Sequence, residues 1–404
     1  MGLVMKERKA VARETRLRYQ KATKKTKKRI LDEFTRLAGY NRKYAITLLN
    51  SEANGRRGEP SGKERRGRPR TYAGTIVEAL VWLWKLFDFM CGKRLVVAIR
   101  ANLEILAYRG DIALDARQKE KLLSISSASI DRLLEGERKR TRLKGRSYTT
   151  PGSLLKHQIP IRTFSEWEEN RPGFVEIDLV GHDGGSSRGD FAHTLTVTDV
   201  CTGWTEIRAV KNKARKWVFA ALIGIREVLP FPLQGIDSDN GGEFINAHLV
   251  KYCDENSITF TRSRPQRKND NCYVEQKNGS VVRSIAGYCR YDSDRQVRLL
   301  NSIYAEARLL VNFFYPSMKL IEKTRIGSKV KKRYDTPKTP YQRVMDSALV
   351  SAQGKAQLMR QQEELNLVEI KRRMEVKQEQ LVKLTAAIHK RSQREDRQSF
   401  RVAK

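Results

Sequence analysis

The sequence predicts a multidomain protein with all-α modules at the N-terminus, an α/β block in the middle and a basic, mostly helical C-terminal segment. Apolar residues recur at helical spacing through 24–49 and 73–134. Strand-like runs alternate with helical stretches through 174–290, and a helical pattern returns at 358–390. Gly, Arg and Pro accumulate over 51–72, which indicates a basic linker between the first two modules.

The first module, 1–50, is predicted to be a DNA-binding arm. An apolar helical pattern over 24–38 ends at Gly39, and a second short helix with basic residues at its start follows. A helix, a glycine turn and a second helix in this order resemble a helix-turn-helix. Arg42 and Lys43 are therefore candidate DNA contacts, although any small helical hairpin has the same pattern.

The linker 51–72 contains the tetrapeptide Gly-Arg-Pro-Arg, which resembles the core of a minor-groove element, the AT-hook. Arg68 and Arg70 are candidate DNA contacts on this interpretation. A plain basic linker is the alternative, and its charge would also contact phosphates.

A second helical DNA-binding module is predicted over 73–145. Ser126 or Ser127 is a candidate N-cap for its third helix. Trp82 and Trp84 are interpreted as core residues and not as base-stacking groups. Basic residues follow the third helix, so this module is also expected to contact DNA.

Three acids stand out in the central block. A strand-like run over 174–180 carries Asp178, and a run over 233–236 leads to Asp239 and a glycine-rich turn. Glu275 lies in the opening turns of a helical stretch. Acids at the end of a buried strand are common among site residues in α/β folds, although Asp and Asn are also ordinary turn residues.

These acids carry a resemblance to a known family. Asp239 begins the hexapeptide Asp-Asn-Gly-Gly-Glu-Phe, and 35 residues separate it from Glu275. The pattern resembles the DDE signature of the retroviral-integrase superfamily and of bacterial insertion-sequence transposases, with Asp178 as the first acid. The resemblance covers roughly 170–290. It implies a ribonuclease H-like catalytic core over 165–320, with a mixed five-stranded sheet and flanking helices.

The resemblance implies a DNA transposase that cleaves and joins strands at the ends of a mobile element. Asp178, Asp239 and Glu275 would be both the catalytic residues and the ligands of two Mg²⁺ or Mn²⁺ ions. Asp178 would bridge the ions, Asp239 would bind one and Glu275 the other. Two hard cations clamped by carboxylates supply what phosphoryl transfer needs, without a covalent enzyme intermediate.

Other residues near the triad compete for these roles. Asp237 shares the strand-end face with Asp239, because strand side chains alternate with period two, and is interpreted as a supporting residue. Asp183 and Glu243 are further alternatives, and Glu243 is also interpreted as supporting. His182 is interpreted as a loop residue and not as a ligand.

Two further groups of basic residues are candidate DNA contacts. Lys268, Lys277 and Arg283 flank the third acid and could hold phosphates near the ions. In the basic C-terminal segment, 321–404, residues 326–345 are a candidate DNA-contact element. An amphipathic helical pattern follows, and it suits a coiled coil or a docked helix equally well.

The charge distribution favours a polyanionic partner. Lys and Arg number 80 against 46 Asp and Glu, a net charge of +34. The charge is +15 over 1–72 and +12 over 317–404, but only +2 over 171–290. The flanks are therefore expected to hold double-stranded DNA. The resemblance further implies that this DNA comprises element ends and target, and that the protein acts on it as a homo-oligomer.

Composition also excludes several classes. No apolar run approaches the roughly 18 residues of a membrane span, and no signal-peptide core is evident, so we expect a cytoplasmic protein that is nucleoid-associated when bound to DNA. The 5 scattered Cys predict reduced thiols, mostly in the core, and no zinc finger. Two alternatives stay open: a metal-dependent endonuclease that cuts without joining, and a non-enzymatic DNA-binding regulator with an inactive core.

Overall fold

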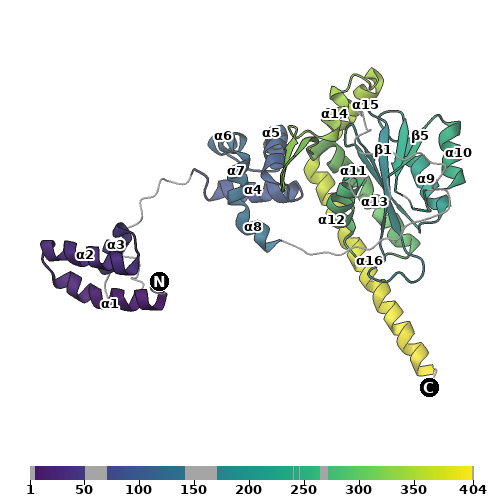
Figure 1. Cartoon of the computed structure of the whole chain (residues 1–404). Helices are drawn as coiled ribbons and strands as arrows, with labels where there is room; N and C mark the ends of the chain where they lie inside the picture. The colour runs from purple at the N-terminus through teal and green to yellow at the C-terminus, as the bar shows by residue number, and fades with distance from the viewer. Residues whose placement is uncertain are drawn as a thin grey trace. The chain divides into compact units, whose positions relative to one another are not determined.

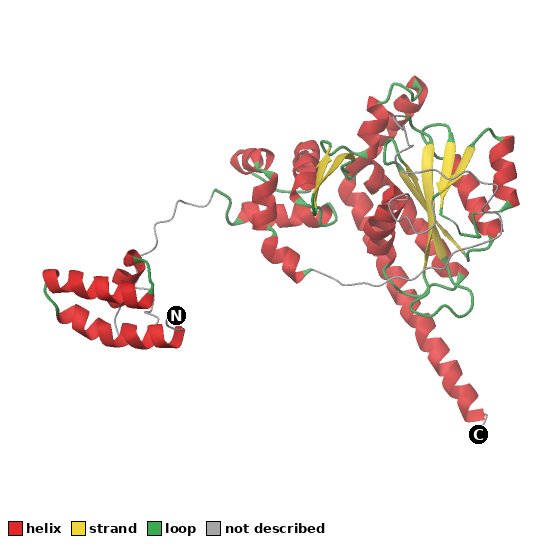
Figure 2. Ribbon diagram, viewed as in Figure 1, coloured by secondary structure: helices red, strands yellow, loops and turns green. Residues whose placement is uncertain are grey.

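The computed structural model describes residues 5–50, 71–141, 171–239, 241–244, 246–263 and 272–402. The chain divides into two compact units, Met1–Thr71 and Tyr72–Lys404. The predicted fold class is confirmed: a helical N-terminal region precedes a mixed five-stranded sheet with helices and a helical C-terminal region (Figures 1 and 2).

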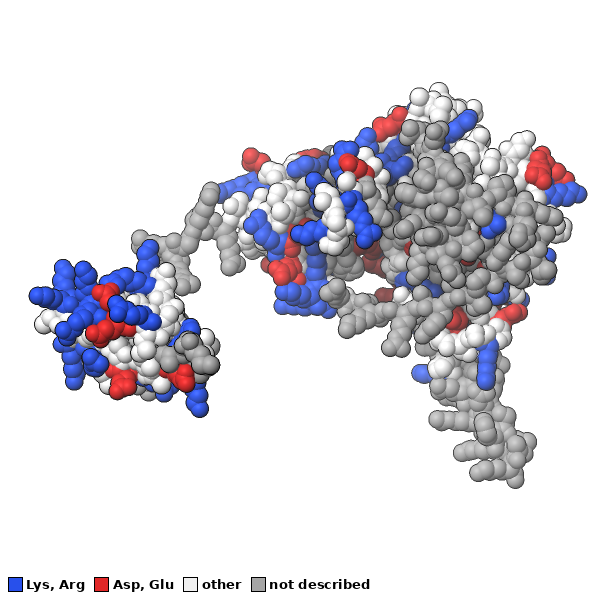
Figure 3. Space-filling model, viewed as in Figure 1, with Lys and Arg blue, Asp and Glu red and all other residues white. Residues whose placement is uncertain are grey.

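The first unit is a bundle of three helices, α1 (Met5–Lys21), α2 (Lys24–Ala38) and α3 (Arg42–Asn50). Its core forms around Phe34, which is 2% exposed, because the apolar face of α2 packs against both neighbours. Gly39 adopts the left-handed conformation that ends α2, and its N–H donates to the carbonyl of Thr35. Lys and Arg side chains cover much of the visible surface of this unit (Figure 3).

The second unit begins with the helices α4 (Thr75–Leu86), α5 (Gly92–Tyr108), α6 (Ala116–Ser124), α7 (Ser127–Leu133) and α8 (Glu135–Arg140). Ser126 caps α7 by accepting the N–H of Ser129. Trp84 is buried as expected, and its indole N–H donates to the carbonyl of Met90. Gly92 allows the closest approach in this module, because a Cβ there would lie 2.3 Å from the carbonyl oxygen of Ser127.

The central sheet contains β1 (Phe174–Gly181), β2 (His193–Asp199), β3 (Thr205–Val210), β4 (Gly235–Ser238) and β5 (Thr259–Arg262). The strand order is β3-β2-β1-β4-β5. Strand β2 pairs antiparallel with β1 and β3, and strand β4 pairs parallel with β1 and β5. The strand predicted over 233–236 is found two residues later, so Asp237 is inside the sheet.

Helices cover the sheet in two layers. They are α9 (Arg215–Arg226), α10 (Ala247–Glu255), α11 (Cys272–Lys277), the π-helical turn η1 (Asn278–Val282), α12 (Arg283–Ala286), α13 (Asp294–Leu309) and a second π-helical turn, η2 (Leu310–Phe314). Val175 and Ile177 of β1 pack in one cluster with residues of α9 and α10. The alternate residues Glu176 and Asp178 therefore face the opposite layer, which contains α11.

The remaining elements are the hairpin β6 (Leu320–Ile326) and β7 (Lys329–Tyr334), followed by α14 (Pro340–Asp346), α15 (Ala352–Glu364) and α16 (Leu367–Val402). The C-terminal helical pattern suited a coiled coil or a docked helix. In the structure α16 docks along α13 and buries Ile370, Met374 and Leu381. Lys377, which interrupts the apolar pattern, donates to Glu306 of α13.

Several features of the structure differ from the expectations. The helices α6, α8, α13 and α14 and the hairpin β6–β7 are additions to the predicted elements. The thiols were expected mostly in the core, but of the four described ones only Cys253 is buried, while Cys91 and Cys289 lie exposed in a cap and a loop. Among the described residues, no helix is both long and apolar enough to cross a bilayer.

Candidate active site

The three predicted acids lie near one another, around the point where the internal strand β4 ends. Asp178 lies within β1, and Asp239 immediately follows the neighbouring parallel strand β4. Because Ile177 pairs with Ser238 in the register, the next residue on each strand is one of these two acids. Glu275 lies in the first turn of α11, on the layer that covers this face of β1.

The electrostatics of Asp178 reflect this arrangement. Burial, together with the negative charges of Asp239 and Glu275, raises the pKa of its carboxyl to about 7. Two hydrogen bonds oppose this shift: the N–H of Leu179 donates to Asp178 Oδ1 at 2.8 Å, and Asn278 Nδ2 donates to Asp178 Oδ2 at 2.6 Å. The charged groups that shift this pKa are therefore both anions, an environment that favours a bound cation.

Asn278 is a site residue that sequence reasoning missed. It lies three positions after Glu275, and residues at this spacing share one face of a helix. It also begins the π-helical turn η1, and such turns are frequent at functional sites. The Asn278 Oδ1 atom is buried and has no hydrogen-bond partner among the described residues. The i+3 spacing was the signal that could have found it.

Glu176 is a second missed residue. It is 1% exposed, and its Oε2 atom accepts the backbone N–H groups of Tyr273 at 2.9 Å and Val274 at 2.8 Å. A carboxylate at a helix N-terminus satisfies N–H groups that have no partner within the helix. Glu176 thus ties the strand of Asp178 to the helix of Glu275. An acid two residues before Asp178 in an otherwise apolar strand was the available signal.

The turn after β4 is tight around Asp239. Asp239 Oδ1 accepts the N–H of Gly241 at 2.9 Å, and a Cβ on Gly241 would lie 2.9 Å from that same oxygen and 2.8 Å from Glu243 Oε1. Burial, and to a lesser extent the charge of Asp239, raise the pKa of Glu243. Asp237 is 1% exposed and accepts a hydrogen bond from Thr261 Oγ1 at 2.5 Å, so it braces β4 against β5.

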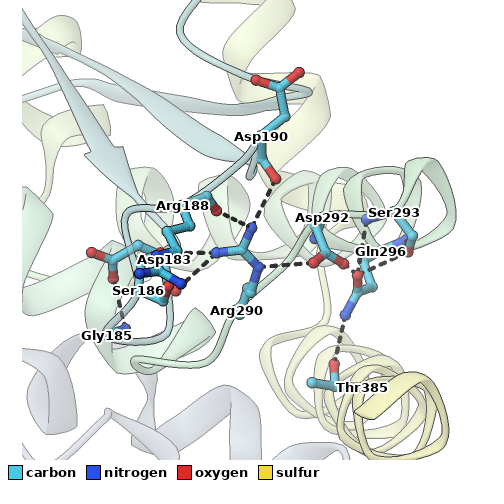
Figure 4. Close-up of polar contacts among 10 residues, drawn as sticks. All are labelled: Asp183, Gly185, Ser186, Arg188, Asp190, Arg290, Asp292, Ser293, Gln296 and Thr385. Carbon is cyan, nitrogen blue, oxygen red and sulfur yellow. Dashed lines mark hydrogen bonds and ion pairs between the residues drawn. The ribbon is translucent and has the colours of Figure 1, made fainter. Parts of the chain in front are cut away.

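The loop after β1 is held separately by Arg290 (Figure 4). Its guanidinium donates to the carbonyls of Ser186 and Arg188 at 2.8 Å each, and to those of Asp183 and Asp190 at longer distance. Asp183 therefore belongs to this exposed loop. The network fixes the loop that leaves the strand of Asp178.

His182 is a core histidine. It is fully buried, its Nε2 atom lies 2.7 Å from Thr194 Oγ1, and burial lowers its pKa to about 3. The imidazole is therefore neutral at physiological pH. Its Nδ1 atom is buried and has no hydrogen-bond partner among the described residues.

Two candidate DNA contacts, Lys277 and Arg283, lie close to the candidate site in the chain but have different surroundings from each other. Lys277 is half-buried and lines a cavity of about 190 Å³ together with Arg94 and Asp88, and burial lowers its pKa to about 7. Arg283 donates to the carbonyls of Gly181 at 2.9 Å and Gly287 at 3.3 Å.

The other candidate DNA contacts are two residues of α3 and three residues that the structure does not describe. Arg42 forms an exposed ion pair with Asp32, and Lys43 is exposed beside it. Arg68, Arg70 and Lys268 lie outside the described residues.

Comparison with known proteins decides the family. Residues 168–268 match the family model described as "Integrase core domain". An uncharacterized protein, y4rM, from Sinorhizobium fredii (strain NBRC 101917 / NGR234) is 42% identical over 327 residues, which are 81% of this chain and 91% of that protein. The chain belongs to the integrase and transposase superfamily. The matched range of this integrase core contains Asp178 and Asp239 and ends before Glu275.

Two solved structures similar to the integrase core are retroviral catalytic domains. One is the HTLV-2 integrase catalytic core domain in complex with magnesium, with 15% identity, a TM-score of 0.28, and 36% of this chain and 90% of that chain covered. The other is the BIV integrase catalytic core domain, with 15% identity, a TM-score of 0.29, and coverage of 43% and 95%.

The donors at the edge of the integrase core are chemically suited to a hard divalent cation. They are carboxylate oxygens, the ligand type that Mg²⁺ and Mn²⁺ prefer, and the buried Asn278 Oδ1 adds a neutral oxygen beside them. Within the described ranges, no group of three or more His, Cys, Asp or Glu side chains is close enough to form a complete metal site. The fit is therefore one of donor chemistry and local charge.

Proposed function

We propose that this protein is a DNA transposase that cleaves DNA at the ends of a mobile element and joins the freed strand to a target. Membership in the superfamily indicates DNA processing of the integrase or transposase type. The observation that carries the finer proposal is the parallel register of β1 and β4, which sets Asp178 beside Asp239. The charges of Asp239 and Glu275 both raise the pKa of Asp178, which supports a single electrostatic site made from the three acids.

In this proposal Asp178, Asp239 and Glu275 hold Mg²⁺ or Mn²⁺, expected as two ions, which would lower the pKa of the attacking oxygen and neutralise the leaving one. The charges of Asp239 and Glu275 both act on Asp178, so the three carboxylates would hold the ions together. Asn278 orients the Asp178 carboxylate through Nδ2, and Glu176 fixes the start of the helix that carries Glu275. The attacking groups are water in cleavage and a freed 3′-OH in joining.

DNA is proposed to be held mainly outside the integrase core. Of the two basic flanks, 1–72 carries the larger charge excess. It contains the arm 1–50, with Arg42 and Lys43, and the linker 51–72, with Arg68 and Arg70. The module 73–145 is a further proposed contact, and Lys268 a candidate beside the site. Double-stranded DNA is the proposed partner, bound by a homo-oligomer.

Two candidate phosphate contacts are less suited to that role. Lys277 is half-buried in a cavity beside Arg94, and the guanidinium of Arg283 donates to the carbonyls of Gly181 and Gly287. We propose that Arg283 supports the end of β1 and the turn after α12. Their replacement would then affect folding before it affects DNA affinity.

The test is a matched set of carboxylate substitutions assayed on duplex DNA with Mg²⁺. Asp239→Asn, Asp178→Asn and Glu275→Gln should abolish cleavage and joining and leave DNA binding largely unchanged, because each removes an oxygen anion and no phosphate contact. Asp237→Asn is the control, since Asp237 bonds to Thr261 inside the sheet. Full activity of the Asp239 variant would refute the assignment.

The same assays separate the rival functions. Cleavage without any joined product would identify a metal-dependent endonuclease. Sequence-specific binding without cleavage, under Mg²⁺ or Mn²⁺, would identify a regulator with an inactive core. Joining that persists in EDTA would contradict the metal-dependent scheme.

A further inference from the structure

The hairpin β6–β7 stands apart from the five-stranded sheet (Figure 2). Every residue of β7 is exposed, and the apolar residues Ile326 and Val330 near its turn are 71% and 47% exposed. A two-stranded hairpin that buries neither face is only marginally stable by itself. Packing therefore does not explain the residues that this hairpin presents to solvent.

The charge of the hairpin is strongly one-sided. The stretch 320–334 contains six Lys and Arg and a single acid, Glu322. That acid is already engaged, because Glu322 pairs with Arg333 at 3.0 Å. The hairpin therefore presents a clear excess of positive charge to solvent.

The lysines of β7 lie on both faces of the ribbon. The register places Lys331 opposite Thr324 and Lys329 opposite Ile326, so these two lysines share one face, and Lys332 lies on the other. Lys329, Lys331 and Lys332 form no ion pair among the described residues. Neighbouring like charges destabilise a sheet, and a polyanion along the ribbon would relieve that repulsion.

Hydrogen bonds attach the base of the hairpin to the rest of the second unit, whereas β7 is exposed. The N–H of Lys319 donates to Asp335 Oδ1 at 2.6 Å, and its Nζ donates to the carbonyl of Cys201 at 2.7 Å. Asp335 also pairs with Arg343 at 2.7 Å. The ribbon is therefore preorganised on the second unit, which lowers the ordering cost of binding a partner.

We propose that β6–β7 is a DNA-binding ribbon that lies in the major groove of duplex DNA. Two strands about 4.8 Å apart, with their side chains, fit a groove about 12 Å wide and not one about 6 Å wide. The lysines would contact the flanking phosphates, and Ile326 near the tip would reach thymine methyl groups. The choice of DNA as the polyanion rests on the proposed function.

The test compares two double variants in salt titrations of duplex binding. Lys331→Ser with Lys332→Ser should make the slope of log affinity against log salt shallower by about 2, since each phosphate contact contributes about 0.9. The control, Lys251→Ser with Lys383→Ser, removes the same charge from side chains that are 76% and 80% exposed on helices. Thermal unfolding checks that both variants remain folded.

A second measurement addresses the groove. Duplex DNA carrying 5-iodouracil, whose iodine lies in the major groove, should crosslink to the hairpin of the intact protein under ultraviolet light. An unchanged salt slope in the hairpin variant, an equal loss in the control, or crosslinks only outside 320–334 would each overturn the proposal. Wild-type protein that binds duplex DNA through the ribbon but never cleaves it would instead refute the proposed function alone.

Discussion

Glu176 and Val274, 98 residues apart in the chain, are joined by a hydrogen bond of 2.8 Å from the backbone N–H of Val274 to the Glu176 carboxylate. The bond attaches the strand of Asp178 to the first turn of the helix that carries Glu275. The bond is buried, so the loss of its acceptor would leave the N–H without a partner. Glu176 is therefore a positioning residue for the candidate site.

Replacing Glu176 should loosen that helix. Glu176→Ala leaves two N–H groups without their acceptor, so the free energy of unfolding should fall by about 1–3 kcal/mol. Displacement of Glu275 should also raise the Mg²⁺ concentration needed for half-maximal cleavage. Glu176→Gln keeps an acceptor oxygen and should recover part of both effects. Urea unfolding and a Mg²⁺ titration of cleavage measure them, and an unchanged Mg²⁺ midpoint in the Ala variant would exclude a positioning role.

Divalent cations should stabilise the folded protein through the three acids. Ligand that binds only the native state adds about 2.7 kcal/mol at one hundred times its dissociation constant, so Mg²⁺ should raise the melting temperature and EDTA should reverse the rise. Asp178→Asn should lose most of this gain. Asp183→Asn is the matched control, because Asp183 lies in the exposed loop held by Arg290. An equal gain in both variants would place the cation elsewhere.

His182 should contribute to acid sensitivity. Its pKa is lowered to about 3 in the folded protein, chiefly by burial, so the native imidazole stays neutral while the unfolded one takes a proton near pH 6.5. The contribution is fully present above pH 6.5 and is lost as the pH falls toward 3. His182→Gln should reduce the pH slope of unfolding free energy between these limits by up to about 1.4 kcal/mol per pH unit. Urea unfolding at several pH values measures this slope, and the exposed His248→Gln is the control. A slope in His182→Gln equal to that of the wild type would contradict the prediction.

Removal of residues 1–71 should separate DNA holding from chemistry. That segment contains the first unit and most of the N-terminal charge, so the truncated protein should lose most affinity and sequence preference for element ends, and its salt slope should become shallower. It should remain folded, because Tyr72–Lys404 is a compact unit. Weak, non-specific cleavage should persist with Mn²⁺. Undiminished preference for element ends would locate sequence recognition in the second unit.

The deletion should end at residue 71 and not extend to 145. The hydroxyl of Tyr315 donates to the carbonyl of Leu86 at 3.3 Å, and Lys371 of α16 pairs with Asp88 at 2.5 Å. Removing α4 and α5 would break these contacts and expose the apolar cluster that they share with α13 and α16.

The sequence predicted the elements whose signals are local. Strand β1 and helix α9 follow from apolar periodicity, and the turn after β4 follows from its glycines. Asp178 could therefore be assigned to a strand and Asp239 to the end of one. The hairpin β6–β7 was missed because Lys and Arg occupy both of its faces, which removes the alternation that marks a strand.

Residues that act through tertiary contacts could not be read in the same way. The spacing of Asn278 from Glu275 places both residues on one helix face, but only the bond to Asp178 shows what Asn278 does. Glu176 likewise stands out as an acid in an apolar strand, but the N–H groups that it accepts belong to the start of α11, 97 and 98 residues away. The choice between a docked helix and a coiled coil depended on Glu306, which receives both Lys377 and Arg373 across the α13–α16 contact.

The docking of α16 on α13 has a consequence for the order of synthesis. A ribosome makes α13 well before α16, so the apolar surface that Ile370, Met374 and Leu381 cover stays open while the intervening chain is being translated. The nascent protein thus completes its core only after α16 emerges. A premature stop codon before this helix would yield a chain with every proposed catalytic acid and an exposed, aggregation-prone core.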